Sequence, residues 1–302
     1  MSVTVATNTF TAGGSLPSAL RLGAVRLAVT DIDRAIAFYL RIVGLTLRDR
    51  RTEAGRAVAH LSNGREDVVE LQAEPGARPA GRHAGLYHVA LNYDSRLELG
   101  RALRRIGETG TVIQGASDHR THEAIYLADP DGNGLELAWD CPRERWPATI
   151  EQYAGGPRPL DVNGLLKLAS SDGSHGAGPG RVGHVHLHVG DVERALEFYE
   201  GLVGFELQMH LGSGAFVSAG GYHHHLGVNV RHGANAAPPP ADAVGLREWR
   251  IYLPTSADVA ATRARLVGGG APIYSDRDAD FVTADPWGIP LRVAVDPNAG
   301  KR

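Results

Sequence analysis

An internal repeat constrains the fold of this chain more than any other feature of its sequence. Residues 25–45 (VRLAVTDIDRAIAFYLRIVGL) match residues 185–205 (VHLHVGDVERALEFYEGLVGF) without a gap, at a constant offset of 160 (185 minus 25). The positions that recur are Val25, Leu27, Val29, Asp31, Arg34, Ala35, Phe38, Tyr39, Val43 and Gly44. Self-similarity at one fixed spacing indicates duplication. We therefore predict two homologous halves.

Each copy predicts the same order of elements, β-α-β-β-β. A short strand with alternating apolar residues comes first. Asp31 and Asp191 then stand where a helix N-cap is expected, and Gly44 and Gly204 stand where the helices should end. Further apolar stretches complete each unit. A second, more diverged unit of the same kind follows in each half, and both contain a turn of the DPDG or DPWG type before their last strand.

The predicted architecture is α+β, with four βαβββ modules in two homologous halves. The N-terminal half spans 20–146 and the C-terminal half 181–302. The four modules span 20–80, 85–146, 181–234 and 243–298. We expect residues 1–19 to form a flexible N-terminal extension and residues 147–180 a linker, which holds one short helix in DVNGLLKLA.

The composition excludes several classes of protein. A chain of 302 residues with 43% hydrophobic residues suits two folded domains and argues against disorder. The net charge of -3 argues against a nucleic-acid binder, and the single Cys141 cannot form an internal disulfide. No apolar run approaches the roughly 20 residues of a membrane span, and the N-terminus lacks the features of a signal peptide. We expect a cytoplasmic protein with no nucleic-acid or membrane partner.

The motifs in these modules resemble a known superfamily. The module opening V-x-D-x-x-R-A-x-x-F-Y is similar to that of the vicinal oxygen chelate superfamily, which includes glyoxalase I, bleomycin-resistance proteins and extradiol ring-cleaving dioxygenases. GLYHVAL with DPDGNGLEL in module two, and GHVHLHV with GGYHHHLGVN in module three, resemble the bacterial catechol 2,3-dioxygenase branch with four modules. The resemblance implies that the modules pair into curved, antiparallel-rich sheets around a metal cleft.

The resemblance also implies metal ligands on the first and last strands of paired modules. Module two offers His88 and Glu136 at these positions, and module three offers His184. Two histidines and one carboxylate form the facial triad of non-haem Fe(II) oxygenases, which leaves coordination positions open. We expect Fe(II), with Mn(II) as an alternative, in a cleft built from modules two and three. In module four Arg292 takes the carboxylate's place, and a guanidinium cannot ligate, so modules one and four become structural partners.

By the same resemblance, three further residues carry the chemistry. His224, expected together with His223 and His225 on the last strand of module three, matches the catalytic base, and His119 resembles a histidine that hydrogen-bonds an oxygen of the substrate or the bound oxygen species. Tyr126 then orients the substrate. The implied function is that of an Fe(II)-dependent extradiol dioxygenase that cleaves a catechol-type ring with O2 to a muconic semialdehyde-type product. Its partners are a small aromatic diol and O2, and the family favours a homodimer.

The ligand assignment has alternatives at this stage. His186 and His188 share the strand face of His184 and compete with it for the metal. His122 stands where related sequences more often have a small hydroxyl residue, which leaves the polarity of the pocket and the substrate open. The sequence does not decide whether modules two and three pair within one chain or between subunits.

Two other classes of function compete with the dioxygenase. Glu70, near the last strand of module one, could join His88 and Glu136 in a glyoxalase-like lyase or isomerase that uses a non-redox metal such as Zn(II) or Ni(II). A non-catalytic small-molecule-binding protein would need an aromatic cleft and no metal, which the 6% aromatic content and the ligand set disfavour.

Overall fold

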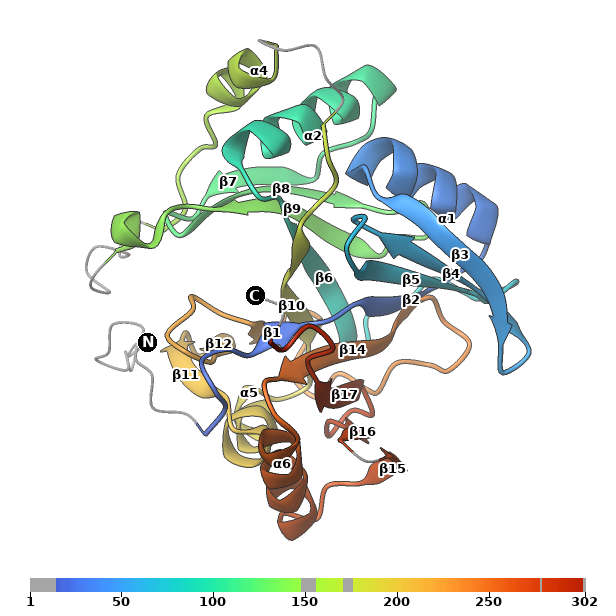
Figure 1. The fold of residues 1–302 in the computed structure, drawn as a ribbon, viewed down its shortest axis with the longest axis vertical. Coiled ribbons are helices and arrows are strands. Elements are labelled where there is room, and N and C mark those ends of the chain that lie inside the picture. Colours follow the sequence, from blue (N-terminus) through green and yellow to red (C-terminus); the bar gives the residue numbers. More distant parts are fainter. Residues whose placement is uncertain (1–14, 148–155, 171–175, 278, 301–302) are drawn as a thin grey trace.

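The computed structural model describes residues 15–147, 156–170, 176–277 and 279–300 (Figure 1). Within them, each of the four modules has the predicted order of one strand, one helical segment and three strands. The α+β class and the duplication into two homologous halves are therefore confirmed. Of the predicted extension and linker, residues 1–14, 148–155 and 171–175 lie outside the described part, and the helix expected in the linker is α4 (Val162–Ser170).

The N-terminal half contains modules one and two. Module one consists of β2 (Val25–Val29), α1 (Ile32–Phe38), the π-helical turn η1 (Tyr39–Val43), β3 (Thr46–Glu53), β4 (Arg56–Ser62) and β5 (Asp67–Ala73). Module two consists of β6 (Gly85–Asn92), α2 (Arg96–Thr109), β7 (Gly115–Asp118), β8 (His122–Ala128) and β9 (Gly134–Asp140). The short strand β1 (Arg21–Leu22) precedes module one, and the 3-10 turn η2 (Arg143–Arg145) follows module two.

The C-terminal half contains modules three and four. Module three consists of β10 (Arg181–His188), α5 (Val192–Leu196), the π-helical turn η3 (Glu197–Val203), β11 (Glu206–His210), β12 (Gly214–Ser218) and β13 (Leu226–Asn229). Module four consists of β14 (Gly245–Leu253), α6 (Ser256–Gly268), β15 (Ile273–Arg277), β16 (Asp280–Ala284) and β17 (Pro290–Val295). The predicted strand over His223, His224 and His225 is wrong, because β13 begins only at Leu226 and the three histidines lie in the turn before it.

The repeat residues fix the helices at both ends, as predicted. The Asp31 carboxylate accepts hydrogen bonds from two backbone amides in the first turn of α1, and Asp191 accepts one from the first turn of α5. These carboxylates satisfy amides that have no partner within the helix. Gly44 and Gly204 follow the π-helical turns with φ of 90° and 101°, a left-handed conformation that glycine adopts without a steric penalty.

The first strands of the modules pair across the two halves. β6 of module two runs antiparallel to β10 of module three in an eight-stranded sheet, whose order is β11-β12-β13-β10-β6-β9-β8-β7. β2 of module one runs antiparallel to β14 of module four, and their sheet has the order β15-β16-β17-β14-β2-β5-β4-β3 with β1 beside β14. Within each module the first strand is parallel to the last one. Two mainly antiparallel sheets result, and each joins one module from either half.

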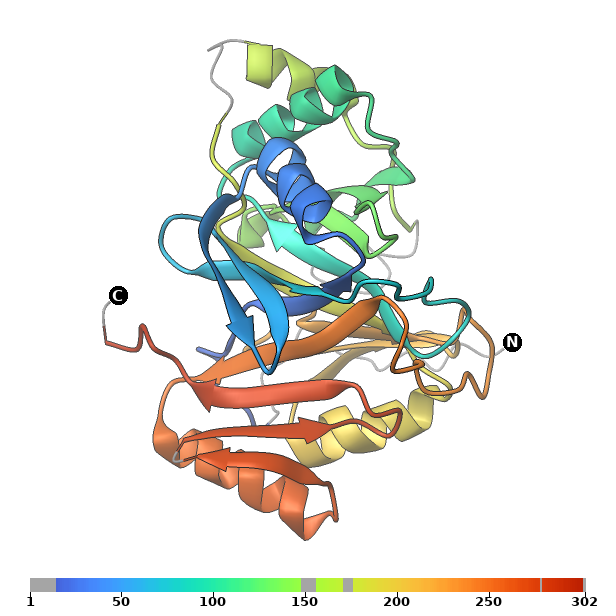
Figure 2. The ribbon, with the colours of Figure 1, turned by 90° about the vertical axis from the view of Figure 1, so that its right-hand side faces the viewer.

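The helices lie at the two ends of the molecule, with the sheets between them. Helices α1, α2 and α4 gather at one end, and α5 and α6 lie at the opposite end (Figures 1 and 2). A continuous apolar core runs through both halves and includes Val25, Leu187 and Trp249, all fully buried. No helix in the described ranges is both long and apolar enough to cross a membrane.

Two buried tyrosines at equivalent repeat positions tie neighbouring modules together. The Tyr39 hydroxyl donates to Asp129 Oδ2 at 3.3 Å in the DPDG turn, and the Tyr199 hydroxyl donates to Asp285 Oδ2 at 3.0 Å in the DPWG turn. Burial, followed by the charge of the adjacent carboxylate, raises the pKa of both tyrosines well above the usual value. These contacts hold the turns that lead into β9 and β17, the last strands of modules two and four.

Candidate metal centre

The junction of β6 and β10 brings three of the sequence-predicted residues together. His88 and His186 are partners in the antiparallel pairing of β6 with β10, while Ala90 and Glu136 are partners in the parallel pairing of β6 with β9. Because side chains two residues apart share a face of the sheet, His88, His184 and Glu136 all project from the same face. β9 can approach β6 this closely because residue 134 is a glycine. A Cβ at this position would lie only 1.9 Å from the Tyr87 carbonyl oxygen of β6.

The two histidines converge on one carboxylate oxygen. His88 Nε2 and His184 Nε2 each lie 3.1 Å from Glu136 Oε2, and the three candidate ligand atoms lie within 4.8 Å of one another. All three side chains are buried, with Glu136 and His184 only 1% exposed. Burial alone would raise the pKa of Glu136, but the charge of His184 and contacts with the neighbouring histidines outweigh it and hold that pKa well below its usual value.

The donor set fits a divalent metal ion. His184 Nδ1 is a buried atom without a hydrogen-bond partner among the described residues, and the contacts of His88 Nε2 and Glu136 Oε1 at 3.1 Å stay within the same group of histidines and Glu136. Unpartnered buried polar atoms are rare in folded proteins and are costly. A cation bound between the two imidazoles and the carboxylate would engage His88 Nε2, and imidazole nitrogen with carboxylate oxygen is the set that Fe(II) and Mn(II) accept.

His224 lies beside this centre, on the side of module three. Its ring centroid is 4.1 Å from that of His184, and its Nδ1 is 2.8 Å from His223 Nδ1. His223 Nε2 in turn lies 3.3 Å from Asp140 Oδ1, and Asp140 also accepts hydrogen bonds from the Tyr222 hydroxyl at 2.8 Å and from Arg181. Burial lowers the pKa of His224 well below its usual value, so the imidazole is neutral at pH 7.

His119 and Tyr126 form a pair on the side of module two. His119 Nε2 lies 2.8 Å from the Tyr126 hydroxyl, and the Tyr126 ring centroid is 5.5 Å from that of His88. Burial, with a smaller effect from His122, lowers the pKa of His119 to about 4.

The residue that touches the central carboxylate on this side is His122. Its Nε2 lies 3.1 Å from Glu136 Oε1, and its ring stacks between those of His119 and His223 at centroid distances of 4.6 and 4.7 Å. The sequence analysis treated His122 only as a departure that alters pocket polarity. Strand periodicity places His122 on the same face of β8 as Tyr126, four residues later, but its position beside Glu136 follows only from the pairing of β8 with β9.

The competing histidines of β10 take other positions. His188 Nδ1 lies 2.9 Å from the Asn229 side chain, and its ring stacks on His232. The His186 ring lies over Gly227, where a Cβ would meet its atoms at 3.0 Å. Neither residue belongs to a potential metal-ligand group in the described part of the chain, whereas His184 does.

Gly227 also occupies the position equivalent to Glu136. Glu136 pairs with Ala90, two residues after His88. In the same way Gly227 pairs with His186, two residues after His184. The strand positions therefore offer three candidate ligands, and the fourth symmetric position carries no side chain. A metal ion held by three such residues would keep coordination positions for other molecules, as in facial-triad centres.

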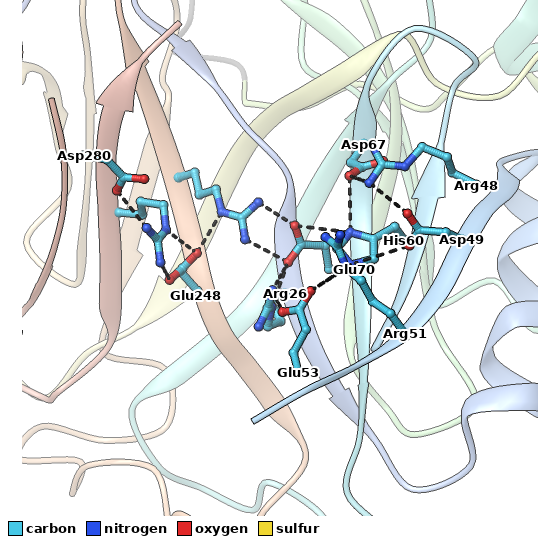
Figure 3. A network of polar contacts seen from close by, with 12 residues as sticks. Arg26, Arg48, Asp49, Arg51, Glu53, His60, Asp67, Glu70, Glu248 and Asp280 are labelled. Carbon is cyan, nitrogen blue, oxygen red and sulfur yellow. Dashed lines mark hydrogen bonds and ion pairs between the residues drawn. The ribbon is translucent and has the colours of Figure 1, made fainter. Parts of the chain in front are cut away.

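The corresponding place in the other sheet is filled by ion pairs (Figure 3). Arg250 binds both oxygens of Glu70 at 2.5 and 2.8 Å, and it also donates to Glu248 at 2.7 Å. Arg26 adds a third contact to Glu70, and Arg292 binds both oxygens of Glu248. Burial raises the pKa of Glu70, but the arginines outweigh it and lower that pKa to about 2.

This network overturns the alternative that placed Glu70 in one site with His88 and Glu136. Glu70 lies on β5 of the other sheet, and its charge is compensated by two arginines. His60, Asp67 and Glu70 do lie within 4.8 Å of one another, but they belong to the same arginine-rich network (Figure 3). Protein cations already occupy the place where a metal ion would bind.

Comparison with known proteins follows the same division into halves. The sequence matches the family described as the Glyoxalase/Bleomycin resistance protein/Dioxygenase superfamily over residues 21–137 and 181–290. It is 35% identical over 274 residues to the catechol-2,3-dioxygenase of Bacillus subtilis (strain 168). This alignment covers 88% of this chain and 93% of that protein. It is also 28% identical over 123 residues to the lactoylglutathione lyase of Salmonella typhimurium. That alignment covers 39% of this chain and 91% of the lyase.

Solved structures show the same fold. A putative dioxygenase from Bacillus subtilis superposes with a TM-score of 0.68 at 13% identity, covering 91% of this chain and 85% of that chain. Glyoxalase I from Zea mays superposes with a TM-score of 0.57 at 18% identity, covering 92% of each chain. At these identities the likeness concerns the fold alone.

Proposed function

Because the chain belongs to the glyoxalase/bleomycin resistance protein/dioxygenase superfamily, we propose that its buried centre is the active site of a metal-dependent extradiol dioxygenase. The observation that carries the proposal is the set of His88, His184 and Glu136 together with Gly227 at the fourth strand position. The similarity to a catechol-2,3-dioxygenase over most of both chains supports it. The substrate is then a small aromatic diol of the catechol type, O2 is the second substrate, and the cytoplasm is the expected site of action.

In this proposal His88, His184 and Glu136 hold Fe(II), or Mn(II), which accepts the same ligands. The chemistry that such an ion supplies, when bound, is electron transfer between the ring of the diol and O2. An ion held by these three residues would have coordination positions available for other molecules. The ring bond beside the diol breaks, both atoms of O2 enter the product, and the product is of the muconic semialdehyde type.

His224 is the proposed base. Its Nδ1 faces His223, so its Nε2 is the ring nitrogen left to accept a proton from a diol hydroxyl and to return it as the ring opens. A neutral imidazole is required for the first of these steps. His223 and Asp140 hold the His224 ring in place through the contacts of 2.8 and 3.3 Å described above.

His119 and Tyr126 are proposed to bind the substrate from the side of module two. Their mutual contact of 2.8 Å fixes the direction of both polar groups. The distance of 5.5 Å between the Tyr126 and His88 rings supports a role for the tyrosine in orienting an aromatic substrate. His119 then offers a hydrogen bond to an oxygen of the substrate or of O2.

Oxygen uptake is the decisive test. The protein is loaded anaerobically with Fe(II) and mixed with a panel of catechols and hydroquinones, and O2 consumption and the yellow ring-opened product are measured together. We expect stoichiometric uptake and product with at least one diol. His224→Asn should lower kcat by about 10²–10⁴-fold with unchanged iron content.

Two outcomes would contradict the proposal. If iron is bound and no diol in the panel consumes O2, the lyase or isomerase alternative gains, and conversion of a hemithioacetal with Zn(II) or Ni(II) becomes the relevant assay. If no metal binds at all, the site is not the metal centre proposed here and a non-catalytic binding role is favoured.

A further inference from the structure

A second group of potential metal ligands adjoins the candidate centre. His184, His223 and His224 each offer a ring nitrogen, and these nitrogens lie within 4.8 Å of one another. All three side chains are buried, at 1%, 3% and 9% exposure. The group shares His184 with the facial triad, but it contains no carboxylate.

Neighbouring residues orient His223 as a ligand. Its Nε2 faces Asp140 Oδ1 at 3.3 Å, so in the neutral ring the proton lies on Nε2 and the lone pair on Nδ1. Metal-binding histidines commonly have their other ring nitrogen bonded to a carboxylate in this way, which fixes the tautomer. Asp140 is itself fixed by the Tyr222 hydroxyl and by Arg181.

The remaining nitrogens of the group are placed to accept a cation. His223 Nδ1 and His224 Nδ1 face each other at 2.8 Å; a proton on His224 Nδ1 satisfies this contact without a metal, and a metal ion bound by both nitrogens would displace that proton. His184 Nδ1 is buried and has no hydrogen-bond partner in the part of the chain that the structure describes. The facial triad uses His184 Nε2 beside Glu136, so occupancy of both sites at once requires His184 Nδ1 to release its proton to solvent and the imidazolate to bridge the two ions.

We propose that His184, His223 and His224 form a second, inhibitory metal site that takes a cation with a preference for nitrogen ligands, such as Zn²⁺ or Cu²⁺. Three imidazoles are a common ligand set for Zn²⁺, with the fourth position left to water. Cations such as Mn²⁺ that prefer oxygen ligands are drawn instead to the set that contains Glu136. Occupancy of the second site removes His224 from its role as base. That consequence rests on the proposed function, whereas the site itself does not.

The three-histidine site is tested by measuring the Zn²⁺ content of a variant that lacks the facial triad. The background is the double variant His88→Gln/Glu136→Gln, which removes two triad ligands and leaves the three-histidine group intact. Zn²⁺ bound after equilibrium dialysis is measured by elemental analysis, and the Zn absorption edge reports its ligands. We expect one Zn²⁺ per chain with nitrogen and water oxygen as ligands.

Further substitutions in that background identify the ligands. His223→Gln should abolish stoichiometric binding, and Asp140→Asn should weaken it by about 10–100-fold because it removes the partner of a ligand. His186→Gln is the matched control, since His186 is an equally buried neighbour on β10 outside the group, and it should leave the Zn²⁺ content unchanged. The site is refuted if the double variant binds no Zn²⁺, or if His223→Gln and His186→Gln behave alike.

A second measurement separates this inference from the proposed function. Zn²⁺ is titrated into the wild-type protein loaded with Fe(II), and O2 uptake is followed together with bound Zn²⁺. Uptake should fall in proportion to Zn²⁺ bound. If Zn²⁺ binds and uptake persists, the inhibitory role is refuted. If no catechol gives uptake even without Zn²⁺, the proposed function fails while the metal-content experiment still decides whether the site exists.

Discussion

Replacement of Arg250 by methionine should destabilise the protein by about 3–5 kcal/mol, because it leaves buried carboxylates without their main cation. The Arg250 side chain is 13% exposed and binds Glu70, which is 3% exposed, through two hydrogen bonds. It also bridges Glu70 to Glu248. Methionine preserves much of the side-chain volume but supplies no donor, so the change removes the charge with little loss of packing.

The pKa of Glu70 gives a second estimate of the same quantity. A carboxyl whose pKa falls from 4.5 to about 2 is stabilised in its ionised form by about 3 kcal/mol in the folded protein. Because the folded pKa lies below the unfolded one, this stabilisation is present above pH 4.5 and is lost as the pH falls toward 2. Arg26 retains part of the effect in the variant, which favours the lower end of the range.

Urea unfolding monitored by tryptophan fluorescence is the assay, since Trp249 is fully buried on β14 beside Arg250. The difference between wild type and Arg250→Met should be largest at pH 7 and should shrink below pH 4.5. Arg263→Met is the control, because Arg263 and Asp276 are 40% and 48% exposed and such pairs contribute below about 1 kcal/mol. If Arg250→Met unfolds within about 1 kcal/mol of the wild type at pH 7, or no differently from the control, the ion network is not what stabilises this sheet.

Three further predictions concern the metal centre and the modules. Glu136→Gln should reduce bound Fe(II) at least tenfold in elemental analysis while His186→Gln retains it, and equal iron in both variants would contradict the triad. Gly134→Ala should cost about 3 kcal/mol or more in urea unfolding, since its Cβ would lie 1.9 Å from a β6 carbonyl oxygen, whereas Gly107→Ala in α2 has open space and should be neutral or stabilising. Asp31→Ala should cost about 1 kcal/mol in the same assay through loss of the α1 N-cap, and an unchanged midpoint would show that solvent replaces the cap.

Much of the fold could be predicted because its determinants are local in the sequence. The capping residues Asp31 and Asp191 and the left-handed Gly44 and Gly204 act within one or two turns of chain, and each of them behaves in the structure as its residue type suggests. Because the sequence repeats at a constant offset, a helix start or end predicted in one half is also predicted at the equivalent residue of the other half. Strand pairing across the halves depends on contacts more than 90 residues apart, such as that of His88 with His186, and only the distribution of ligand types pointed to it.

The errors have physical causes that the sequence pattern does not contain. His223, His224 and His225 precede an apolar run and were therefore expected on a strand, but Gly220 and Gly221 both adopt positive φ and turn the chain before β13 begins. The contact of His122 with Glu136 depends on the pairing of β8 with β9, which sets which strand residues share a face. Comparison of sequence motifs shows only that residue 122 is a histidine where related sequences more often have a small hydroxyl residue.

The two sheets solve the same electrostatic problem in different ways. Each buries at least one carboxylate near the strands where two modules meet, Glu70 in one sheet and Glu136 in the other, and a buried charge is tolerated only with compensation. Arg250 and Arg26 compensate Glu70 within the chain. Around Glu136 the contacts described are with His88, His122 and His184. In the proposed function a metal ion completes this compensation, whereas in the other sheet the arginines already supply it.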